Sequence, residues 1–410
     1  MKKLILAAAI LSSMTACHDK TATITISNAL DFDRHGEIVE IAIDSLPATV
    51  GTGKFLYVTD CEGNEIPSQV THDNLLIFPT DVKASSSATY KVCSSETRHD
   101  YDTIARGRVY PERDDDMGWE NDKVGFRAYG PALQNRGERG FGYDIFLKRD
   151  TIYPILDMLY AIELNPESWA RVDSIRKSEG DAAAEEFIKT FSYHVDHGYG
   201  MDCYAVGPTL GAGVAALMVS DTIVYPWCYR EAEILDNGPL RFSVKLGFTP
   251  LKVGADTSVI ETRVIILDSG SHLNRTDISY TGLTAPAPIA TGIVLHDTEG
   301  TVTADPEKMF ISYIDPTQGP DNGKVFMGAT FPVNVTETRV DRHDDSPSHV
   351  LAISPYTPGD TYRYYWGFAW DKTDIDNIDD WNDHLARQAA TLRSPLKIEI
   401  NKCSKLNDIR

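Results

Sequence analysis

Short runs in which apolar and polar side chains alternate constrain the fold of this chain more than any other feature. Every second residue is apolar in 242–248, and residues 260–266 repeat the pattern with one threonine. A period of two places successive side chains on opposite faces of a strand, so that one face can be buried. Glycine, proline, asparagine and aspartate recur between the runs, which favours antiparallel sheets over a βαβ arrangement. The sequence therefore predicts a mainly β protein.

Two units are predicted along the chain. Residues 20–100 contain short alternating runs, such as those around Ile24 and Val39, without helical periodicity, which indicates a small N-terminal β-sandwich. The polar residues 94–102 suit a linker. Residues 104–402 are long enough for a large antiparallel β-sandwich with its own core.

Helices are predicted in two places only. Asn165 is a suitable N-cap, Pro166 suits the first helical position, and an apolar face continues to Phe191 with a break at Gly180. A second helix is expected to begin near Asp379.

Residues 1–17 have the pattern of an export signal. Two lysines precede the apolar residues 4–11, and small residues then lead to Cys17. The apolar run is too short to span a bilayer, which indicates a cleaved signal. Its end resembles a lipobox, although an ordinary secretory signal is the alternative. We expect a periplasmic protein or outer-membrane lipoprotein whose membrane contact is a lipid anchor at Cys17.

Five further cysteines follow the signal. They are Cys61, Cys93, Cys203, Cys228 and Cys403. An oxidising compartment permits disulfides, and Cys61 with Cys93 or Cys203 with Cys228 would each join residues of one unit. The sequence leaves both pairings open.

The charge balance excludes one class of partner. The chain has 60 acidic and 39 basic residues, a formal net charge of −21. Such a surface repels phosphates, so we expect no nucleic-acid partner. A local group of arginines can still bind an acidic sugar.

Residues 192–213 form the strongest candidate site. They contain two histidines, two aspartates, three tyrosines and five glycines. Imidazole and carboxylate move protons near neutral pH, so His194 or His197 is a candidate base, with Tyr199 or Tyr204 as the proton donor. A metal held by the histidines and Asp202 is the alternative, but the spacing matches no tight ligand motif, and we predict neither a metal nor a cofactor.

Residues 119–129 form a second candidate. Trp119 suits stacking on a sugar, and Arg127 suits a bidentate grip on a carboxylate, although a buried Arg–Asp pair is an equal alternative for the arginine. The complete set of candidate substrate contacts is Trp119, Asn121, Asp122, Arg127, Tyr129, Arg139, Asp196, Asp202 and Trp227. Gly-x-Ser-x-Gly, His-Glu-x-x-His and dinucleotide fingerprints are absent from the sequence, which disfavours the enzymes that use them.

Four segments carry a resemblance to known proteins: Trp119 to Asp122, Phe126 to Pro131, Tyr193 to Gly213 and Ile234 to Arg241. Together they resemble one family of exported bacterial proteins, domain of unknown function 4861. The resemblance covers nearly the whole mature chain and implies a galactose-mutarotase-like supersandwich. It also implies a place beside polysaccharide-degrading enzymes, which members of the family typically accompany. At least one branch of the family is associated with dehydration of uronic-acid ends of oligosaccharides.

We therefore predict a dehydratase or lyase that performs β-elimination on oligosaccharides containing uronic acid. His194 or His197 is the predicted base, Arg127 the carboxylate clamp, and Tyr204 or Tyr143 the acid. One alternative is a glycoside hydrolase that uses paired carboxylates from Asp122, Asp202 and Glu231. The other is a glycan-binding lipoprotein without catalytic activity.

Overall fold

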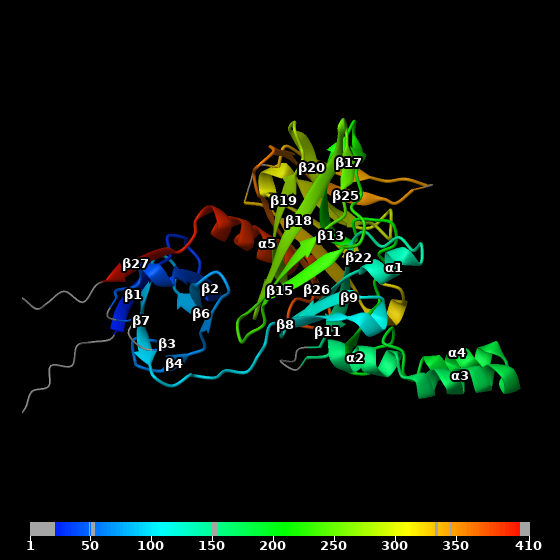
Figure 1. The fold of residues 1–410 in the computed structure, drawn as a ribbon, viewed down its shortest axis with the longest axis horizontal. Coiled ribbons are helices and arrows are strands. Elements are labelled where there is room, and N and C mark those ends of the chain that lie inside the picture. The colour runs from blue at the N-terminus through cyan, green and yellow to red at the C-terminus, as the bar shows by residue number, and fades with distance from the viewer. Residues whose placement is uncertain are drawn as a thin grey trace, which may run out of the picture.

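The protein is described by a computed structural model covering residues 21–48, 50, 54–149, 154–332, 335–344 and 346–401. The predicted signal with Cys17, and also Cys403, lie outside the described residues. Two β-rich bodies stand side by side, joined by an extended linker and by the C-terminal helix (Figure 1). The described helices include none that is both long and apolar enough to cross a membrane.

The N-terminal unit is a small β-sandwich. Its strands are β1 (Thr21–Ser27), β2 (Arg34–Ala42), β3 (Phe55–Thr59), β4 (Glu65–Ile66), β5 (Gln69–Val70), β6 (Leu75–Val82) and β7 (Ser87–Ser95). One sheet has the order β27-β1-β7-β3-β4 and the other β2-β6-β5. The alternating residues Ile24 and Ile26 point into a core shared with Val39, Ile41 and Phe78.

The C-terminal strand belongs to this first sandwich. β27 (Lys397–Asn401) pairs antiparallel with β1, and Ile398 and Ile400 pack against the N-terminal core. The predicted boundaries, which assign residues 104–402 to one unit, are wrong at this end. An isolated five-residue alternating run does not reveal which sheet it will join.

The large unit contains three antiparallel sheets. The first has the order β12-β11-β10-β9-β8, the second β14-β13-β20-β25-β24, and the third β15-β16-β18-β19-β26-β23-β22-β21 with β17 on β18. The first is built from β8 (Arg106–Tyr110), β9 (Asp116–Glu120), β10 (Gly125–Ala128), β11 (Tyr143–Lys148) and β12 (Gly200–Met201). The second is built from β13 (Ala212–Val219), β14 (Thr222–Ile223), β20 (Ala287–Val294), β24 (Glu337–Asp341) and β25 (His349–Tyr356). The third is built from β15 (Glu231–Asp236), β16 (Arg241–Gly247), β17 (Leu251–Val253), β18 (Asp256–Asp268), β19 (Leu273–Thr281), β21 (Val302–Asp305), β22 (Phe310–Asp315), β23 (Val325–Thr330) and β26 (Tyr362–Trp370).

One hydrophobic core joins these three sheets. Trp119, Phe126 and Trp366 are fully buried in it and contact one another edge to face or stacked. The predicted mainly β fold, with a small sandwich followed by a large antiparallel supersandwich, is confirmed.

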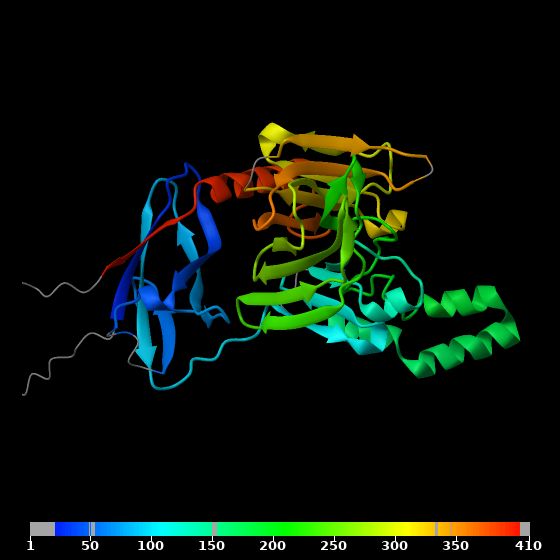
Figure 2. The same cartoon turned by 45° about the horizontal axis from the view of Figure 1, so that its top comes forward.

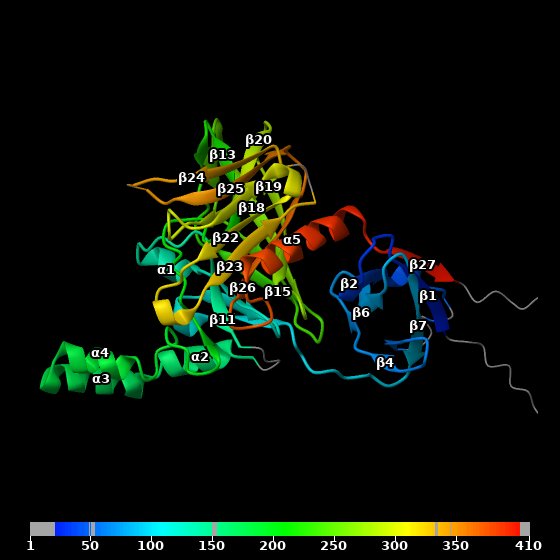
Figure 3. The ribbon, with the colours of Figure 1, turned by 180° about the vertical axis from the view of Figure 1, so that it is seen from behind.

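Helices occupy the edges of the large unit. They are α1 (Pro131–Asn135), α2 (Leu156–Glu163), α3 (Pro166–Glu179), α4 (Asp181–Ile188) and α5 (Ile378–Arg393), with short 3-10 turns at Ile43–Ser45, Pro111–Arg113, Pro306–Lys308 and Pro320–Asn322. The predicted cap at Asn165 is confirmed, because its side chain accepts from Glu167 N, and the predicted break at Gly180 is confirmed, because it separates α3 from α4. The two helices form a hairpin that projects from the body (Figure 2). α5 lies along β22 and β23 through Trp381 and then leads to β27 (Figure 3).

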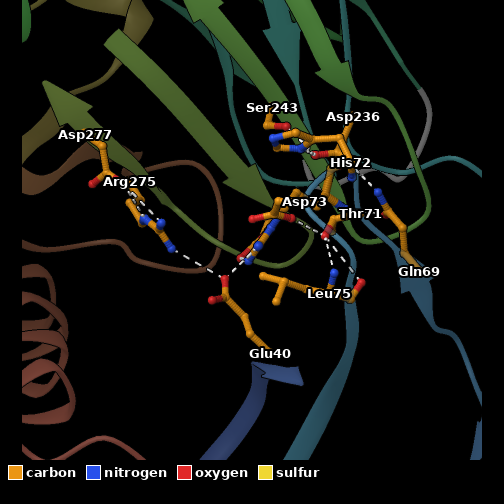
Figure 4. A network of polar contacts seen from close by, with 12 residues as sticks. Glu40, Gln69, Thr71, His72, Asp73, Leu75, Asp236, Ser243, Arg275 and Asp277 are labelled. Atoms are coloured by element: carbon orange, nitrogen blue, oxygen red, sulfur yellow. Dashed lines mark hydrogen bonds and ion pairs between the residues drawn. The ribbon is translucent and has the colours of Figure 1, made fainter. Parts of the chain in front are cut away.

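Polar contacts hold the two units together. Glu40 of β2 accepts hydrogen bonds from Arg241 at 2.6 Å and Arg275 at 3.4 Å. His72 binds Asp236 through its backbone nitrogen at 2.8 Å and through Nδ1 at 2.7 Å (Figure 4). These charged contacts span strands of both units, so they define the relative orientation of the two bodies.

The four described cysteines outside the signal are free thiols. Cys61 is exposed, whereas Cys93, Cys203 and Cys228 are buried. Neither pairing that the sequence left open is formed. Cys228 instead lies 3.5 Å from the Gly140 carbonyl oxygen, in the loop before β11.

Candidate functional site

The sheet that contains β9, β10 and β11 has an apolar face and a charged face. Phe126 and Ile145 point into the main core, while Arg127 and Asp144 stand directly opposite each other on the other face. Strand alternation requires this division, because neighbouring residues of a strand point to opposite sides. α2 and residues 192–202 cover the charged face, so its ionisable groups are buried.

Arg127 lies at the centre of a buried group, called here the Arg127 cluster: Arg127, Asp116, Asp144, Asp202, Tyr129 and Tyr193. Its guanidinium donates to Asp144, with Nε at 3.1 Å, and to Asp202 at 2.8 Å. Asp116 lies 3.7 Å away on the third side. Arg127 is 4% exposed and fully engaged by protein carboxylates, so the prediction that it clamps a substrate carboxylate is wrong.

The cluster contains more carboxylates than one guanidinium can neutralise. Burial raises the pKa of Asp202 to about 6, and the neighbouring Asp144 adds to this effect. Burial likewise raises the pKa of Asp116 to about 6, and Asp116 Oδ1 has no hydrogen-bond partner among the described residues. Burial opposes the charge on Arg127, but Asp144 outweighs it and keeps the pKa of the guanidinium well above its usual value. Two groups that titrate near neutral pH therefore lie behind the surface.

His194 is where this cluster reaches solvent. Its Nδ1 lies 2.8 Å from the Asp202 carbonyl oxygen, and its side chain is 52% exposed. Because a carbonyl oxygen only accepts, Nδ1 carries the proton of the neutral ring and Nε2 keeps its lone pair. No described residue is hydrogen-bonded to Nε2. His194 therefore has the geometry of an exposed base oriented from behind.

His197 is placed differently. Its Nε2 lies 3.2 Å from the Ser192 carbonyl oxygen, and the residue is exposed. No carboxylate is hydrogen-bonded to it among the described residues. Of the two histidines predicted as the base, His194 is the one that contacts the buried cluster.

Tyr129 is the member of the cluster whose residue is partly exposed. Its hydroxyl is buried against Asp144, to which it donates at 2.6 Å. Burial and the adjacent Asp144 carboxylate raise its pKa well above the usual value, so the phenol keeps its proton. His194 and Tyr129 thus stand at two ends of one hydrogen-bonded chain through Asp202, Arg127 and Asp144.

A glycine-rich loop, residues 137–142, lies against the Tyr129 ring. A Cβ built on Gly140 would be 2.6 Å from Tyr129 Cδ2, which leaves no room for a side chain there. Arg139, next to this glycine, is exposed and forms neither an ion pair nor a hydrogen bond with another described side chain. Its guanidinium is available to a ligand that contacts this loop.

Aromatic side chains flank the same loop. Phe141 stacks on Tyr225 with ring centroids 5.3 Å apart and meets Trp227 edge-on at 5.6 Å. All three are partly exposed. Partly exposed rings beside a free arginine suit a sugar, which combines apolar C–H faces with polar groups.

Several predicted substrate contacts are held by the protein itself and do not face the site. The Trp119 indole is fully buried and donates to Asn274 at 2.8 Å, so it cannot stack on a sugar. Asn121 is also buried and donates to the carbonyl oxygens of Asp268 and Ser271, and Asp122 accepts from Gly270 N. Residues 119–122 therefore hold the 268–271 turn in place through these hydrogen bonds.

The two tyrosines predicted as acids are core residues. Tyr143 is 1% exposed, stacks on Trp366 at 4.1 Å and is hydrogen-bonded to Arg263. Tyr204 is 4% exposed, and its hydroxyl has no hydrogen-bond partner among the described residues. Both are wrong as acids that contact substrate, because neither hydroxyl reaches the surface.

Asp196 and the glycines of 192–213 shape the loop. Asp196 accepts from Arg149 and from the backbone nitrogens of Gly198 and Gly200, which lower its pKa although burial opposes this. Gly200 has a φ of +120°, and a Cβ there would lie 1.8 Å from the Leu147 carbonyl oxygen. This glycine permits close contact with β11. Asp196 is occupied by Arg149 and the two backbone nitrogens, so its role is to hold the turn and not, as was predicted, to bind substrate.

Two groups near the site had no sequence signal. Asp144 follows Tyr143 on β11 and becomes recognisable only when the register places it opposite Arg127. His296 Nδ1 lies 2.6 Å from Asp315, and its Nε2 lies 2.6 Å from the Ala205 carbonyl oxygen. Burial lowers the pKa of His296, but Asp315 outweighs it and raises the pKa overall. This pair fastens the loop that contains Tyr204.

Metal ligation was the alternative for the histidines. Among the residues that the structure describes, no group of three histidine, cysteine, aspartate or glutamate side chains is arranged to hold a metal ion. His194 and His197 are each directed to a backbone carbonyl oxygen instead.

Comparisons with known proteins give the following matches. The profile of the family described as Domain of unknown function (DUF4861) matches residues 26–398. Uncharacterized protein P7 of Formosa agariphila is 25% identical over 415 residues, which cover 97% of this chain and 98% of that protein. Two Enterococcus faecalis structures, a protein in the Glycosyl Hydrolase Family 38 and an alpha-mannosidase, align with TM-scores of 0.48 and 0.43 at 10% identity over 93% of this chain. The chain spans about half the length of those two structures, 48% and 46%.

Proposed function

The chain belongs to the DUF4861 family, and from this premise we propose that it is a carbohydrate-active enzyme that performs β-elimination on acidic oligosaccharides. One observation carries the proposal: an exposed imidazole and a protonated phenol stand at two ends of one buried charged chain. The substrate class follows the family resemblance, in which uronic-acid ends are dehydrated. A free arginine and partly exposed aromatic rings beside the phenol support it.

The proposed reaction needs a base, an acid and a cation. His194 Nε2 takes the proton alpha to the uronate carboxylate, and that C–H electron pair becomes the new double bond. The C–O bond at the beta position breaks, and Tyr129 donates its proton to the departing oxygen. Arg139 neutralises the carboxylate, which stabilises the charge that develops during proton removal.

The buried cluster has a positioning role in this proposal. Asp202 holds Nδ1 of His194 through its carbonyl oxygen, and its carboxylate is held by Arg127. Asp144 orients the Tyr129 hydroxyl. Arg127 thus acts through its neighbours and does not contact substrate.

The hydrolase alternative receives less support from the site. Paired carboxylates must reach the substrate from both sides of a cleft. Of the three predicted carboxylates, Asp202 is buried and directed to Arg127, and Asp122 accepts a hydrogen bond from Gly270 N, while Glu231 is exposed.

The test is turnover of uronate oligosaccharides. The unsaturated product is detected by its ultraviolet absorbance and identified by mass spectrometry. Loss of one water without chain cleavage identifies a dehydratase, and cleavage with an unsaturated end identifies a lyase. We expect His194→Ala to lower kcat by about 10²–10⁴-fold. His197→Ala is the matched control and should retain most activity. Folded protein with no unsaturated product on any uronate substrate contradicts the proposal.

Tyr129→Phe tests the acid separately. This change keeps the ring against Gly140 and removes only the hydroxyl that binds Asp144. Substrates with a good leaving group at the beta position should be affected less than substrates with a poor one, because only the poor leaving group needs the proton. An equal loss on both would assign Tyr129 a structural role.

A further inference from the structure

A cavity of about 640 Å³ lies between the two units, away from the Arg127 cluster. Strands β3 and β5 of the small sandwich, the linker 98–103 and the turn 235–239 of the large unit line it. Its volume falls in the range of about 300–1,000 Å³ that is typical of small-molecule sites.

Several polar groups of this cavity are already used by the protein. Gln69 accepts from the backbone nitrogens of Leu240 and Arg241, and Asn237 exchanges two hydrogen bonds with Gly107. Asp236 holds His72, as Figure 4 shows. These side chains build the cavity and join the units, so they are not the groups that would recognise a ligand.

The exposed charged groups of this cavity are two cations, Lys54 and Arg98, and one carboxylate, Asp100. Lys54 is exposed and has no ion-pair partner among the described residues. Within the part of the chain that the structure describes, Arg98 is ion-paired with Asp100 alone, and both side chains are largely exposed, at 74% and 81%. An ion pair in that setting contributes about 0–1 kcal/mol, so a carboxylate or sulfate of a ligand can replace it.

The available apolar surface lies in the same cavity. Among the described residues, seven large hydrophobic side chains are exposed, and two of them, Phe55 at 36% and Val70 at 49%, line this cavity. A flat ring beside two cations suits an acidic sugar, whose C–H face packs on the ring while its acid group binds the cation.

We propose that this cavity is a second binding site for acidic oligosaccharides, separate from the site at His194. The sugar identity rests on the proposed function, whereas the preference for an anion rests on Lys54 and Arg98. The site holds an acidic chain on the enzyme without taking part in the reaction.

The test is native electrophoresis in gels that contain a soluble polysaccharide. The probes are polygalacturonate and alginate for carboxylates, a sulfated galactan for sulfate esters, and an uncharged galactan as the neutral comparison. We expect retardation by at least one acidic probe and none by the neutral galactan. Lys54→Ala with Arg98→Ala should weaken binding by about tenfold or more, and Phe55→Ala should weaken it as well.

Lys177→Ala with Lys189→Ala is the matched control. It removes the same charge from the exposed α3–α4 hairpin and should leave retardation unchanged. His194→Ala should bind like the wild type. Absence of retardation by every acidic probe, or equal retardation of the Lys54/Arg98 variant and the wild type, overturns the inference. Retardation without turnover would instead overturn the proposed function alone.

Discussion

Replacing Arg127 by methionine should destabilise the large unit in a strongly pH-dependent way. Methionine fills a similar volume but removes the positive charge that Asp116, Asp144 and Asp202 share. Removing one partner of a buried charge group leaves the other charges uncompensated. The remaining carboxylates then have to fold in their protonated form.

The magnitude follows from the pKa of about 6 that Asp202 and Asp116 each have, against 3.8 for the free side chain. In the wild type each shift costs about 3 kcal/mol at pH 7.5, since one pKa unit corresponds to about 1.4 kcal/mol. A carboxylate forced to fold protonated costs about 5 kcal/mol at pH 7.5, so the variant loses about 2 kcal/mol at Asp202. The loss at Asp116 is smaller, because Arg113 also favours its charged form. At pH 5 wild type and variant both fold with these two groups protonated, and the loss from this source falls to about zero.

A carboxyl group with a raised pKa binds more protons in the folded state, so its contribution becomes less favourable as pH rises from 3.8 to the folded pKa. In the variant the pKa of these carboxyl groups rises further, so their contribution to the stability keeps becoming less favourable at higher pH. The difference between wild type and variant must therefore grow with pH between 5 and 7.5.

Urea unfolding followed by tryptophan fluorescence measures this difference. All six tryptophans lie between Trp119 and Trp381, so the signal reports the large unit and not the small sandwich. Arg230→Met, at an exposed arginine, is the control and should change the stability by less than about 0.5 kcal/mol. An Arg127→Met variant as stable as the wild type at pH 7.5, or with the same loss at both pH values, would refute the electrostatic reasoning.

Three further changes test other parts of the structure. His296→Asn should lower the Tm by several degrees at pH 6 and by much less at pH 9, because the stabilising pair with Asp315 is lost as pH rises through the raised pKa of His296; melting curves across pH check this. Gly200→Ala should lower the free energy of unfolding by about 1–3 kcal/mol or more, since the methyl group meets the Leu147 carbonyl oxygen at a positive φ; urea unfolding measures it. Trp227→Ala should raise KM on acidic oligosaccharides and leave the Tm nearly unchanged, because the ring is partly exposed; a steady-state titration with a parallel melting curve decides this.

The fold class was predictable because strand formation leaves a local mark. Alternation around Phe242 and around Ile24, and the cap at Asn165, are visible within a few residues, and each became the expected element. The assignment of β27 to the first sandwich was not visible. Its five residues pair with a strand about 370 positions away, and nothing local in an alternating run names its partner.

The candidate site was predictable in its residue types but not in their roles. The segment 192–213 supplies His194 and Asp202, and the segment 119–129 supplies Arg127 and Tyr129, so the sequence pointed to the correct two stretches of chain for the Arg127 cluster. Which side chain reaches solvent depends on what covers each face of the sheet.

By itself the sequence determined a mainly β chain, its family and the two segments that carry ionisable groups. Only the tertiary structure decided that Arg127 is buried, that His194 is exposed and that Tyr129 is partly exposed. The physical reason is that burial and strand register are long-range properties. Asp144 faces Arg127 through cross-strand pairing, and α2 together with the loop before β12 then removes both groups from water.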